Sequence, residues 1–420
     1  MKNSLTNFNI NKKKALKLIF LFGIISLLGD IVYEGARSVN GPFLAVLGAN
    51  AAIIGFVAGT GEFLGYGIRI VSGYFSDKTK AYWLFTIIGY GLLFTVTLLS
   101  MAGIWQIAAL FIISERIGKA LRNPARDTIL SYSTSHVGTG TGFAIVEVLD
   151  QIGAIIGPII FSVLFFLLSV SEKTIHDYQL GYGLLWIPFI ILMIVLVIAY
   201  FLVKNPQELV KIKIENKDNE SFSKVFWIYM LFSFITAFGF VNFVLIGYHV
   251  KVNAILTDAE IPLLYVVAMG IDAVMAILIG KLYDSFKNKM KNDKAGLLTL
   301  LVIPVLSMFL PLLAFSMNYI LIILSMILWG MIMGSHETIM KSVIADLTPL
   351  EKRGTCYGIF STLYGAALFG GSVIIGLLYE ISIPILIIIT ILIEIISIPL
   401  FFMMWKNISK TFSKINIINT

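Results

Sequence analysis

Long apolar runs alternate with short polar stretches along the whole chain. A transmembrane helix needs about 20 mostly apolar residues, and twelve runs reach that length. In the first half of the chain we expect helices near 15–46, 51–75, 82–101, 105–123, 142–168 and 182–203. In the second half we expect them near 225–249, 261–283, 295–316, 319–340, 357–378 and 382–404. The pattern therefore predicts an all-α polytopic membrane protein with twelve transmembrane helices.

The composition supports lipid as the solvent for most of the surface. Of the 420 residues, 58% are hydrophobic and 13% are charged, whereas soluble proteins average about 45–50% apolar and about 25% charged residues. The net charge of +7 arises in the connectors, so it indicates orientation in a membrane rather than nucleic-acid binding. The single cysteine, Cys356, excludes an intrachain disulfide and a metal site built from several cysteines.

The first apolar run needs to be distinguished from a signal peptide. Three lysines, Lys12 to Lys14, precede the apolar stretch 16–28, as they would in a secretory signal. No cleavage site with small residues follows, and the run continues towards Pro42. We therefore expect a retained first transmembrane helix.

Lysine and arginine concentrate in every second connector, together with both tails. These segments hold most of the 31 Lys and Arg residues, whereas the alternate connectors hold Lys173 and Lys251. Basic residues stay on the cytoplasmic side of a membrane. We therefore expect a multi-pass protein of the cell membrane with both termini in the cytoplasm.

A charged turn occurs once in each half of the chain. Gly73-Tyr-Phe-Ser-Asp77 returns as Gly280-Lys-Leu-Tyr-Asp284 at an offset of 207 residues. A second pair of similar segments starts at Asp127 and Glu337. Parallel repeats of this kind build many transporters. The repeat predicts an N-terminal six-helix bundle (1–203), a cytoplasmic linker (204–224) and a C-terminal six-helix bundle (225–420).

With these motifs the chain resembles the major facilitator superfamily over nearly its whole length. The resemblance rests on Gly73-x-x-x-Asp77-Lys78 and its second copy, on Arg116, and on Gly153-x-x-x-Gly157-Pro158. The chain departs from the family pattern at Lys80-Ala81 and at Phe161-Ser162, and the second departure weakens an inference of export from that motif. The resemblance implies a secondary transporter whose two bundles rock about a central site.

The resemblance also implies a gate on the cytoplasmic side, in which Asp77 pairs with Arg122 or Arg126. Simple anchoring of basic residues in the cytoplasm is the alternative, and it leaves the aspartates unexplained. The predicted gating residues are Gly73, Asp77, Lys78, Arg122, Arg126, Gly280 and Asp284.

Ionisable side chains at bilayer depth are costly, and they usually face a cavity or a partner. The runs 82–101, 182–203 and 295–316 contain no Asp, Glu, Lys or Arg, so every third helix is expected to face lipid. Glu394, in the twelfth helix, is an exception without an assigned role. The candidates for lining a substrate and proton cavity are Asp30, Glu34, Arg37, Glu62, Glu115, Arg116, Glu147, Asp150, Asn242, Asp272, His336 and Glu337.

Two interpretations stay open for the acidic candidates. Asp30, Glu34 and Arg37 share one helical face. The acids either bind protons or face the substrate, or Glu34 is satisfied by an ion pair with Arg37 or Arg69. Glu62 and Asp272 lie near the middle of their helices. Burial disfavours the charged form of a carboxyl group, so each either exchanges a proton or stays protonated.

Helical spacing relates other candidates to their neighbours. Glu147 and Asp150 lie three residues apart on one face, and Glu337 can pair with Lys341 one turn away. His336 titrates near neutral pH, which would suit a role in coupling.

The sequence contains no phosphate-binding loop, nucleophile motif or metal-ligand spacing, so we expect no enzyme activity, cofactor or metal. Our preferred hypothesis is proton-coupled efflux of a small organic molecule, with a cationic solute favoured because acids outnumber bases at depth. A proton-coupled symporter importing a nutrient is the alternative. A non-transporting membrane sensor is the alternative of another class. The expected partners are the solute, protons and the lipid bilayer, and we expect a monomer.

Overall fold

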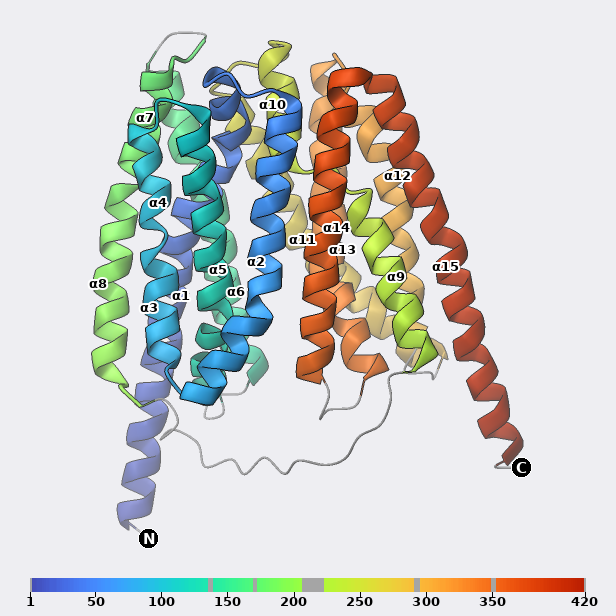
Figure 1. Cartoon of the computed structure of the whole chain (residues 1–420). Coiled ribbons are helices and arrows are strands. Elements are labelled where there is room, and N and C mark those ends of the chain that lie inside the picture. Colours follow the sequence, from blue (N-terminus) through green and yellow to red (C-terminus); the bar gives the residue numbers. More distant parts are fainter. Residues whose placement is uncertain are drawn as a thin grey trace. The chain divides into compact units, whose positions relative to one another are not determined.

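The computed structural model describes residues 2–134, 139–168, 172–205, 223–290, 295–348 and 353–418, and this part of the chain is all-helical (Figure 1). The first half contains α1 (Lys2–Val46), α2 (Ala51–Thr79), α3 (Tyr82–Gly91), α4 (Phe94–Thr97), η1 (Leu98–Met101), α5 (Trp105–Thr134), α6 (Thr139–Leu167), α7 (Ile175–Leu184) and α8 (Trp186–Leu202). The second half contains α9 (Lys224–Phe238), α10 (Phe243–Val252), α11 (Ile261–Met290), η3 (Ala295–Leu301), α12 (Val302–Ala314), α13 (Tyr319–Leu347), α14 (Arg353–Ile381) and α15 (Ile383–Ile418).

The predicted all-α class with twelve transmembrane segments is confirmed. Several segments are interrupted: the third is divided into α3, α4 and η1, the sixth into α7 and α8, and the seventh into α9 and α10. The sixth also begins earlier than predicted, because Thr174 caps α7 by accepting the backbone N–H of Asp177 at 3.4 Å. A capped polar first turn does not register in a search for apolar runs.

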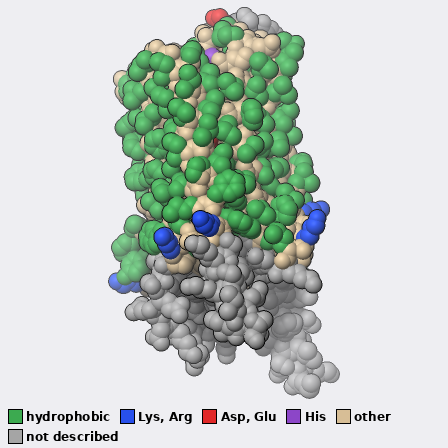
Figure 2. All heavy atoms as spheres, turned by 90° about the vertical axis from the view of Figure 1, so that its right-hand side faces the viewer, with side chains coloured by type: hydrophobic (Ala, Val, Ile, Leu, Met, Phe, Trp, Pro, Cys, Tyr) green, Lys and Arg blue, Asp and Glu red, His purple; other side chains and the backbone are tan. Residues whose placement is uncertain are grey.

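Within the described residues, eleven of the spans are long and apolar enough to cross a membrane. The predicted fourth span, α5, falls outside this group because several charged side chains interrupt its apolar sequence. Hydrophobic side chains cover most of the described part of the face shown in Figure 2, and Lys and Arg side chains gather towards one end of that part. The surface is therefore that of a membrane protein, and α5 is the helix whose charges need protein partners.

The contacts divide the chain into two compact units. Unit 1 comprises Met1–Ala49, Leu64–Glu215 and Leu256–Val266, and unit 2 comprises Asn50–Phe63, Asn216–Ile255 and Val267–Thr420. Each unit thus takes most of one predicted bundle and a short segment from the other half. The predicted linker lies mostly outside the described residues, and the two-bundle boundaries stay a prediction.

In unit 1, α1 packs against α6, α8 and α5, and α3 packs against α5. The backbones of α1 and α6 approach closely, since a Cβ added to Gly35 would stand 3.1 Å from Cα of Gly157. Small residues at such positions let membrane helices pack tightly. In unit 2, α9 packs against α14 and α15, and α12 packs against α13 and α15.

Candidate functional site

One face of α5 carries four ionisable side chains. Glu115, Lys119, Arg122 and Arg126 follow one another at spacings of four, three and four residues, which places them on one side of the helix. Ordered neighbours fix the position of α5. For example, Thr95 Oγ1 in α4 donates to the backbone oxygen of Phe111 at 3.1 Å. The charged face of α5 is thereby held within unit 1.

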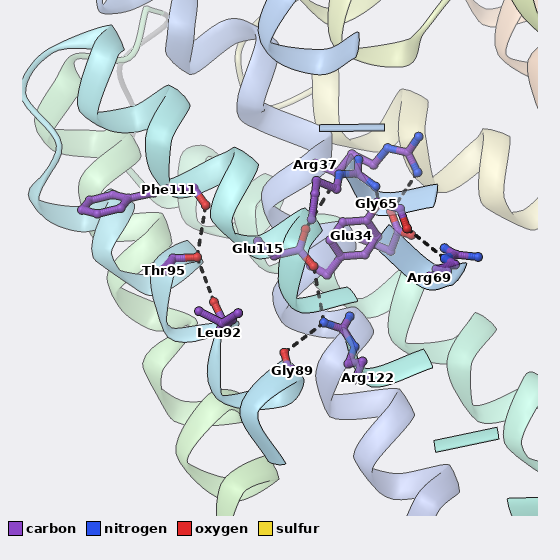
Figure 3. Close-up of polar contacts among 12 residues, drawn as sticks. Glu34, Arg37, Gly65, Arg69, Gly89, Leu92, Thr95, Phe111, Glu115 and Arg122 are labelled. Carbon is purple, nitrogen blue, oxygen red and sulfur yellow. Dashed lines mark hydrogen bonds and ion pairs between the residues drawn. The ribbon is translucent and has the colours of Figure 1, made fainter. Parts of the chain in front are cut away.

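Glu115 is the buried acid of this face, with 2% of its surface exposed. Its Oε1 lies 3.6 Å from the Nη1 atom of Arg122, and its Oε2 lies 3.8 Å from Nε of Arg116. Figure 3 shows the Glu115 and Arg122 side chains directed at one another, with Arg122 also reaching the backbone oxygen of Gly89 at 3.5 Å. Glu115 thus forms ion pairs with two guanidinium groups of its own helix.

A small polar cavity of about 60 Å³ lies among α1, α3, α5 and α6. Its volume is sufficient to hold water. Two acids and three bases line it together with three uncharged polar side chains. They are Asp30, Asp150, Lys119, Arg122, Arg126, Ser26, Tyr90 and Asn123.

The two cavity aspartates come from helices that are packed in contact. A Cβ added to Gly153 of α6 would stand 3.1 Å from Cβ of Asp30 in α1, and Asp150 lies one turn before that glycine. Among the described residues, Oδ1 of Asp150 has no hydrogen-bond partner. The cavity therefore brings together two of the acids that were predicted to line a substrate and proton cavity.

The sequence reasoning did not identify Lys119 as a site residue. Its ammonium group lies 3.9 Å from the centre of the Tyr33 ring, and its side chain lines the cavity with Asp30. Lys119 lies towards one end of its predicted helix, where a basic residue is expected to serve orientation in the membrane. Its spacing of four residues from Glu115 and three from Arg122 is the signal that places it on the charged face.

Glu34 and Arg37 form the simpler of the two predicted arrangements, an ion pair, with 3.7 Å between Glu34 Oε2 and Arg37 Nη1. Tyr265, at the unit-1 end of α11, donates a hydrogen bond of 2.6 Å to the same oxygen. Arg69, the other predicted partner, instead donates through Nε to the backbone oxygen of Gly65 at 2.9 Å. Tyr265 was not predicted, because the candidates were chosen mainly among charged residues and tyrosine is uncharged. Figure 3 shows the Glu34 and Arg69 contacts.

Comparison with known proteins decides the family. The model of the Major Facilitator Superfamily matches residues 19–372. The chain belongs to the Major Facilitator Superfamily. It is therefore a multi-pass membrane protein and a secondary transporter with a small-molecule substrate, and this family is one of transporters, not of enzymes.

Two curated relatives extend the similarity along the chain. An uncharacterized protein of Mycobacterium tuberculosis is 36% identical over 394 residues, which cover 92% of this chain and 93% of the relative. An uncharacterized MFS-type transporter of Methanocaldococcus jannaschii is 27% identical over 387 residues, covering 89% of this chain and 91% of the relative.

Solved structures share the superfamily fold. The nucleoside transporter NupG aligns with a TM-score of 0.68 at 15% identity, over 93% of this chain and 98% of that one. A D-xylose-proton symporter aligns with a TM-score of 0.63 at 14% identity, over 91% and 96% of the two chains. At such identities the likeness concerns the fold alone.

The superfamily's turn motif does not form the predicted pair in this structure. Asp77 is exposed and accepts a hydrogen bond of 3.1 Å from the Tyr82 hydroxyl. Arg122 is engaged by Glu115, and Arg126 by the carboxylate of Asp127 at 2.9 Å. Both arginines therefore already have acidic partners on their own helix.

The remaining residues of the motif have local contacts. The Lys78 ammonium lies 5.6 Å from the centre of the Tyr74 ring, and a Cβ on Gly73 would meet Pro124 at 3.6 Å. In the second copy of the motif Asp284 is exposed, and a Cβ on Gly280 would meet Thr338 at 3.5 Å.

Beside the second copy of the motif, an acid other than Asp284 forms an ion pair. Asp346, near the end of α13, accepts hydrogen bonds from the Tyr283 hydroxyl at 2.6 Å and from Lys287 at 2.9 Å. The repeat of the turn motif singles out Asp284 and gives no information on α13, so the sequence does not identify Asp346.

Four of the predicted candidates are buried in unit 2. Asn242 caps α10, accepting the backbone N–H of Val244 at 2.9 Å. His336 is buried, with Nδ1 2.7 Å from the Tyr364 hydroxyl. Glu62 and Asp272 are buried at 5% and 7% exposure.

Two further candidates are exposed. Glu147, in α6, and Glu337, in α13, both have exposed side chains. The predicted partner of Glu337, the side chain of Lys341, lies outside the described residues. Neither glutamate lines the cavity that holds Asp30 and Asp150.

Proposed function

We propose that this superfamily member is a proton-coupled transporter of a small organic solute, and that Asp30 and Asp150 bind the coupled proton. The observation that carries the proposal is the small polar cavity, onto which both carboxyl groups open. Intramembrane acids that face a cavity commonly form proton relays.

The charges of the cavity make it responsive to a proton. Three basic and two acidic side chains line it, so adding one proton to an aspartate leaves a larger positive excess. That excess weakens the attraction between α5, which carries the bases, and α1 and α6, which carry the acids. A proton changes the balance between two conformations only if it binds them with different affinity, and a change in contacts among these helices supplies such a difference.

The lining also changes the expected solute. A cationic solute was favoured because acids outnumber bases at bilayer depth, yet bases outnumber acids around this cavity. We therefore propose a small organic solute without a preference for positive charge. Efflux remains the proposed direction, with both termini in the cytoplasm and the protein in the cell membrane.

The proposal is tested with the purified protein in liposomes. An acidic lumen and a neutral bath provide the gradient, and uptake is measured for a panel of nucleosides, pentoses and the fluorescent cation ethidium. For transporters inserted with their termini outside, antiport predicts gradient-driven accumulation, and symport predicts accumulation only when the gradient is reversed. Transport that is equal with and without the gradient would contradict proton coupling.

The same preparation tests the sensor alternative. A sensor would transport no member of the panel, and the next measurement would be whether its conformation depends on pH.

Asp30→Asn and Asp150→Asn test which groups bind the proton, because both substitutions retain the size of the side chain and remove its charge. Gradient dependence that survives in both variants would assign the proton to another group.

A further inference from the structure

Glu394 lies in the middle of a membrane-spanning helix and has no exposed surface. The membrane segment of α15 runs from Ile383 to Asn407, and the Glu394 side chain is 0% exposed. Among the described residues, neither of its carboxyl oxygens has a hydrogen-bond partner. Such a group is rare inside proteins, where buried polar atoms are nearly always hydrogen-bonded.

The helices packed against α15 bring no opposite charge to this depth. α9, η3, α12 and α14 are those helices. Residues 225–238 and 295–314 contain no Asp, Glu, Lys, Arg or His, and α14 has Arg353 and Glu380 only near its two ends. An uncompensated buried carboxylate costs several kcal/mol. Glu394 therefore carries its proton in this conformation.

The carboxyl group is directed at the interruption between α9 and α10. A Cβ added to Gly239, which ends α9, would stand 2.5 Å from Glu394 Oε1. A second contact between α9 and α15 agrees with this alignment of the two helices. The ring centres of Phe232 in α9 and Phe401 in α15 lie 6.4 Å apart. Phe232 lies seven residues before Gly239, and Phe401 lies seven residues after Glu394. In Figure 1, α9 and α15 lie side by side.

The interruption spans residues 239–242 and is held by bonds outside the helical pattern. The Trp329 indole donates to the backbone oxygen of Val241 at 3.0 Å, and Asn242 starts α10 as its cap. His336 is a titratable group that approaches from α13, with its ring centre 5.6 Å from that of Phe240. Backbone at such an interruption can change partners without unwinding a regular helix.

We propose that Glu394 and the interruption between α9 and α10 form a second proton-binding site. It lies in unit 2 and does not depend on the cavity of Asp30 and Asp150. The protonated carboxyl group fits against Gly239 as the structure shows. Loss of the proton creates a charge that the site does not compensate, so the interruption must rearrange to bring backbone N–H groups or water to the carboxylate.

Infrared difference spectroscopy of the full-length protein tests this site with the proton as the probe. Spectra in an acidic and an alkaline buffer are subtracted, and the carbonyl band of a protonated carboxyl group disappears where a proton is lost. We expect the wild-type difference to contain one band that Glu394→Gln lacks. Glu380→Gln, at the end of α14, is the matched control and should keep that band.

Superimposable difference spectra for the wild type and Glu394→Gln would overturn the proposal, because Glu394 would then keep its proton throughout as a packing group. If Glu394→Gln does not fold, Gly239→Ala provides the test. Its added methyl group displaces the carboxyl group, so the pH midpoint of the band should move. An unchanged midpoint in a folded Gly239→Ala protein would also contradict the proposal.

Discussion

The hydroxyl group of Tyr265 donates a 2.6 Å hydrogen bond to Oε2 of Glu34, the same oxygen that faces Arg37. This bond joins α1 to the part of α11 that belongs to unit 1, whereas residues from Val267 onwards belong to unit 2. A tyrosine thus attaches a helix shared by both units to the charged face of α1.

Tyr265→Phe removes this hydroxyl and leaves the ring in place. Hydrogen bonds to charged groups contribute about 1.5–3 kcal/mol, so we expect a loss of that order in the free energy of unfolding. Tyr182→Phe is the control, since its hydroxyl donates to the neutral Asn40 side chain at 2.9 Å and such bonds contribute about 0.5–1.5 kcal/mol. A smaller loss for Tyr265→Phe than for the control, in denaturant titrations, would show that Glu34 does not need this donor.

Removing the Glu115 side chain should deprive the guanidinium groups of Arg116 and Arg122 of a carboxylate that both contact. Breaking a buried ion pair from one side costs about 3–5 kcal/mol, and Glu115→Ala should approach that loss of unfolding free energy. Combining Glu115→Leu with Arg122→Met removes both members of the pair, and we expect the double variant to be more stable than Glu115→Leu alone. If the loss of unfolding free energy in the double variant equals the sum of the losses in Glu115→Leu and Arg122→Met, the pair contributes no coupling energy.

Two carboxylates hold the starts of α2 and α11 at positions related by the sequence repeat. Asp258 accepts the backbone N–H of Lys173 at 2.7 Å and the Tyr178 hydroxyl at 2.5 Å. Glu380 accepts the backbone N–H of Ala51 at 2.7 Å. Residues 51 and 258, like residues 173 and 380, differ by 207, the offset of the two charged turns.

Asp258→Ala should therefore loosen the start of α11. Amide hydrogen exchange follows local opening, so we expect faster exchange in residues 256–266 and no change at the start of α2. Glu380→Ala is the reciprocal variant and should give faster exchange in residues 51–54 alone. If both variants speed exchange in the same segment, or if neither variant changes exchange, the two carboxylates do not stabilise these helix starts independently.

The predicted pairing of Asp77 concerns a conformation other than the one in the present structure. Asp77 accepts here from Tyr82, so its predicted pairing with Arg122 or Arg126 requires these arginines to leave their present acids. We expect Asp77→Asn to increase labelling of cysteines placed on the side that is predicted to be cytoplasmic, in a background carrying Cys356→Ser. Identical labelling with and without the substitution would show that Asp77 does not affect the gate.

The sequence was sufficient for the fold because lipid imposes a simple rule. Most spans must be long and apolar, with their backbone hydrogen bonds made within the protein, and eleven of the twelve predicted ranges correspond to described helices of that kind. The interruptions at Gly239 and at Leu185 could not be predicted in this way, because an apolar run looks the same whether its helix is continuous or broken.

The site was predicted in part for an equally physical reason. Asp30 and Asp150 are conspicuous as acids in apolar sequence, and the structure places both on one cavity. Lys119 and Tyr265 were missed, since a lysine near a helix end and a tyrosine are ordinary in membrane proteins. Their importance comes from neighbours on other helices, and spacing within one helix does not report those neighbours.

The central claim, that Asp30 and Asp150 bind the coupled proton, is tested most directly by comparing driven uptake with exchange. The protein carrying both Asp30→Asn and Asp150→Asn is placed in liposomes with a solute that the wild type transports. We predict that this double variant exchanges labelled for unlabelled solute and no longer accumulates it in response to a pH gradient. Glu147→Gln, which changes an exposed acid of the same helix as Asp150, should retain both activities. Gradient-driven accumulation at the wild-type level in the double variant would contradict the claim.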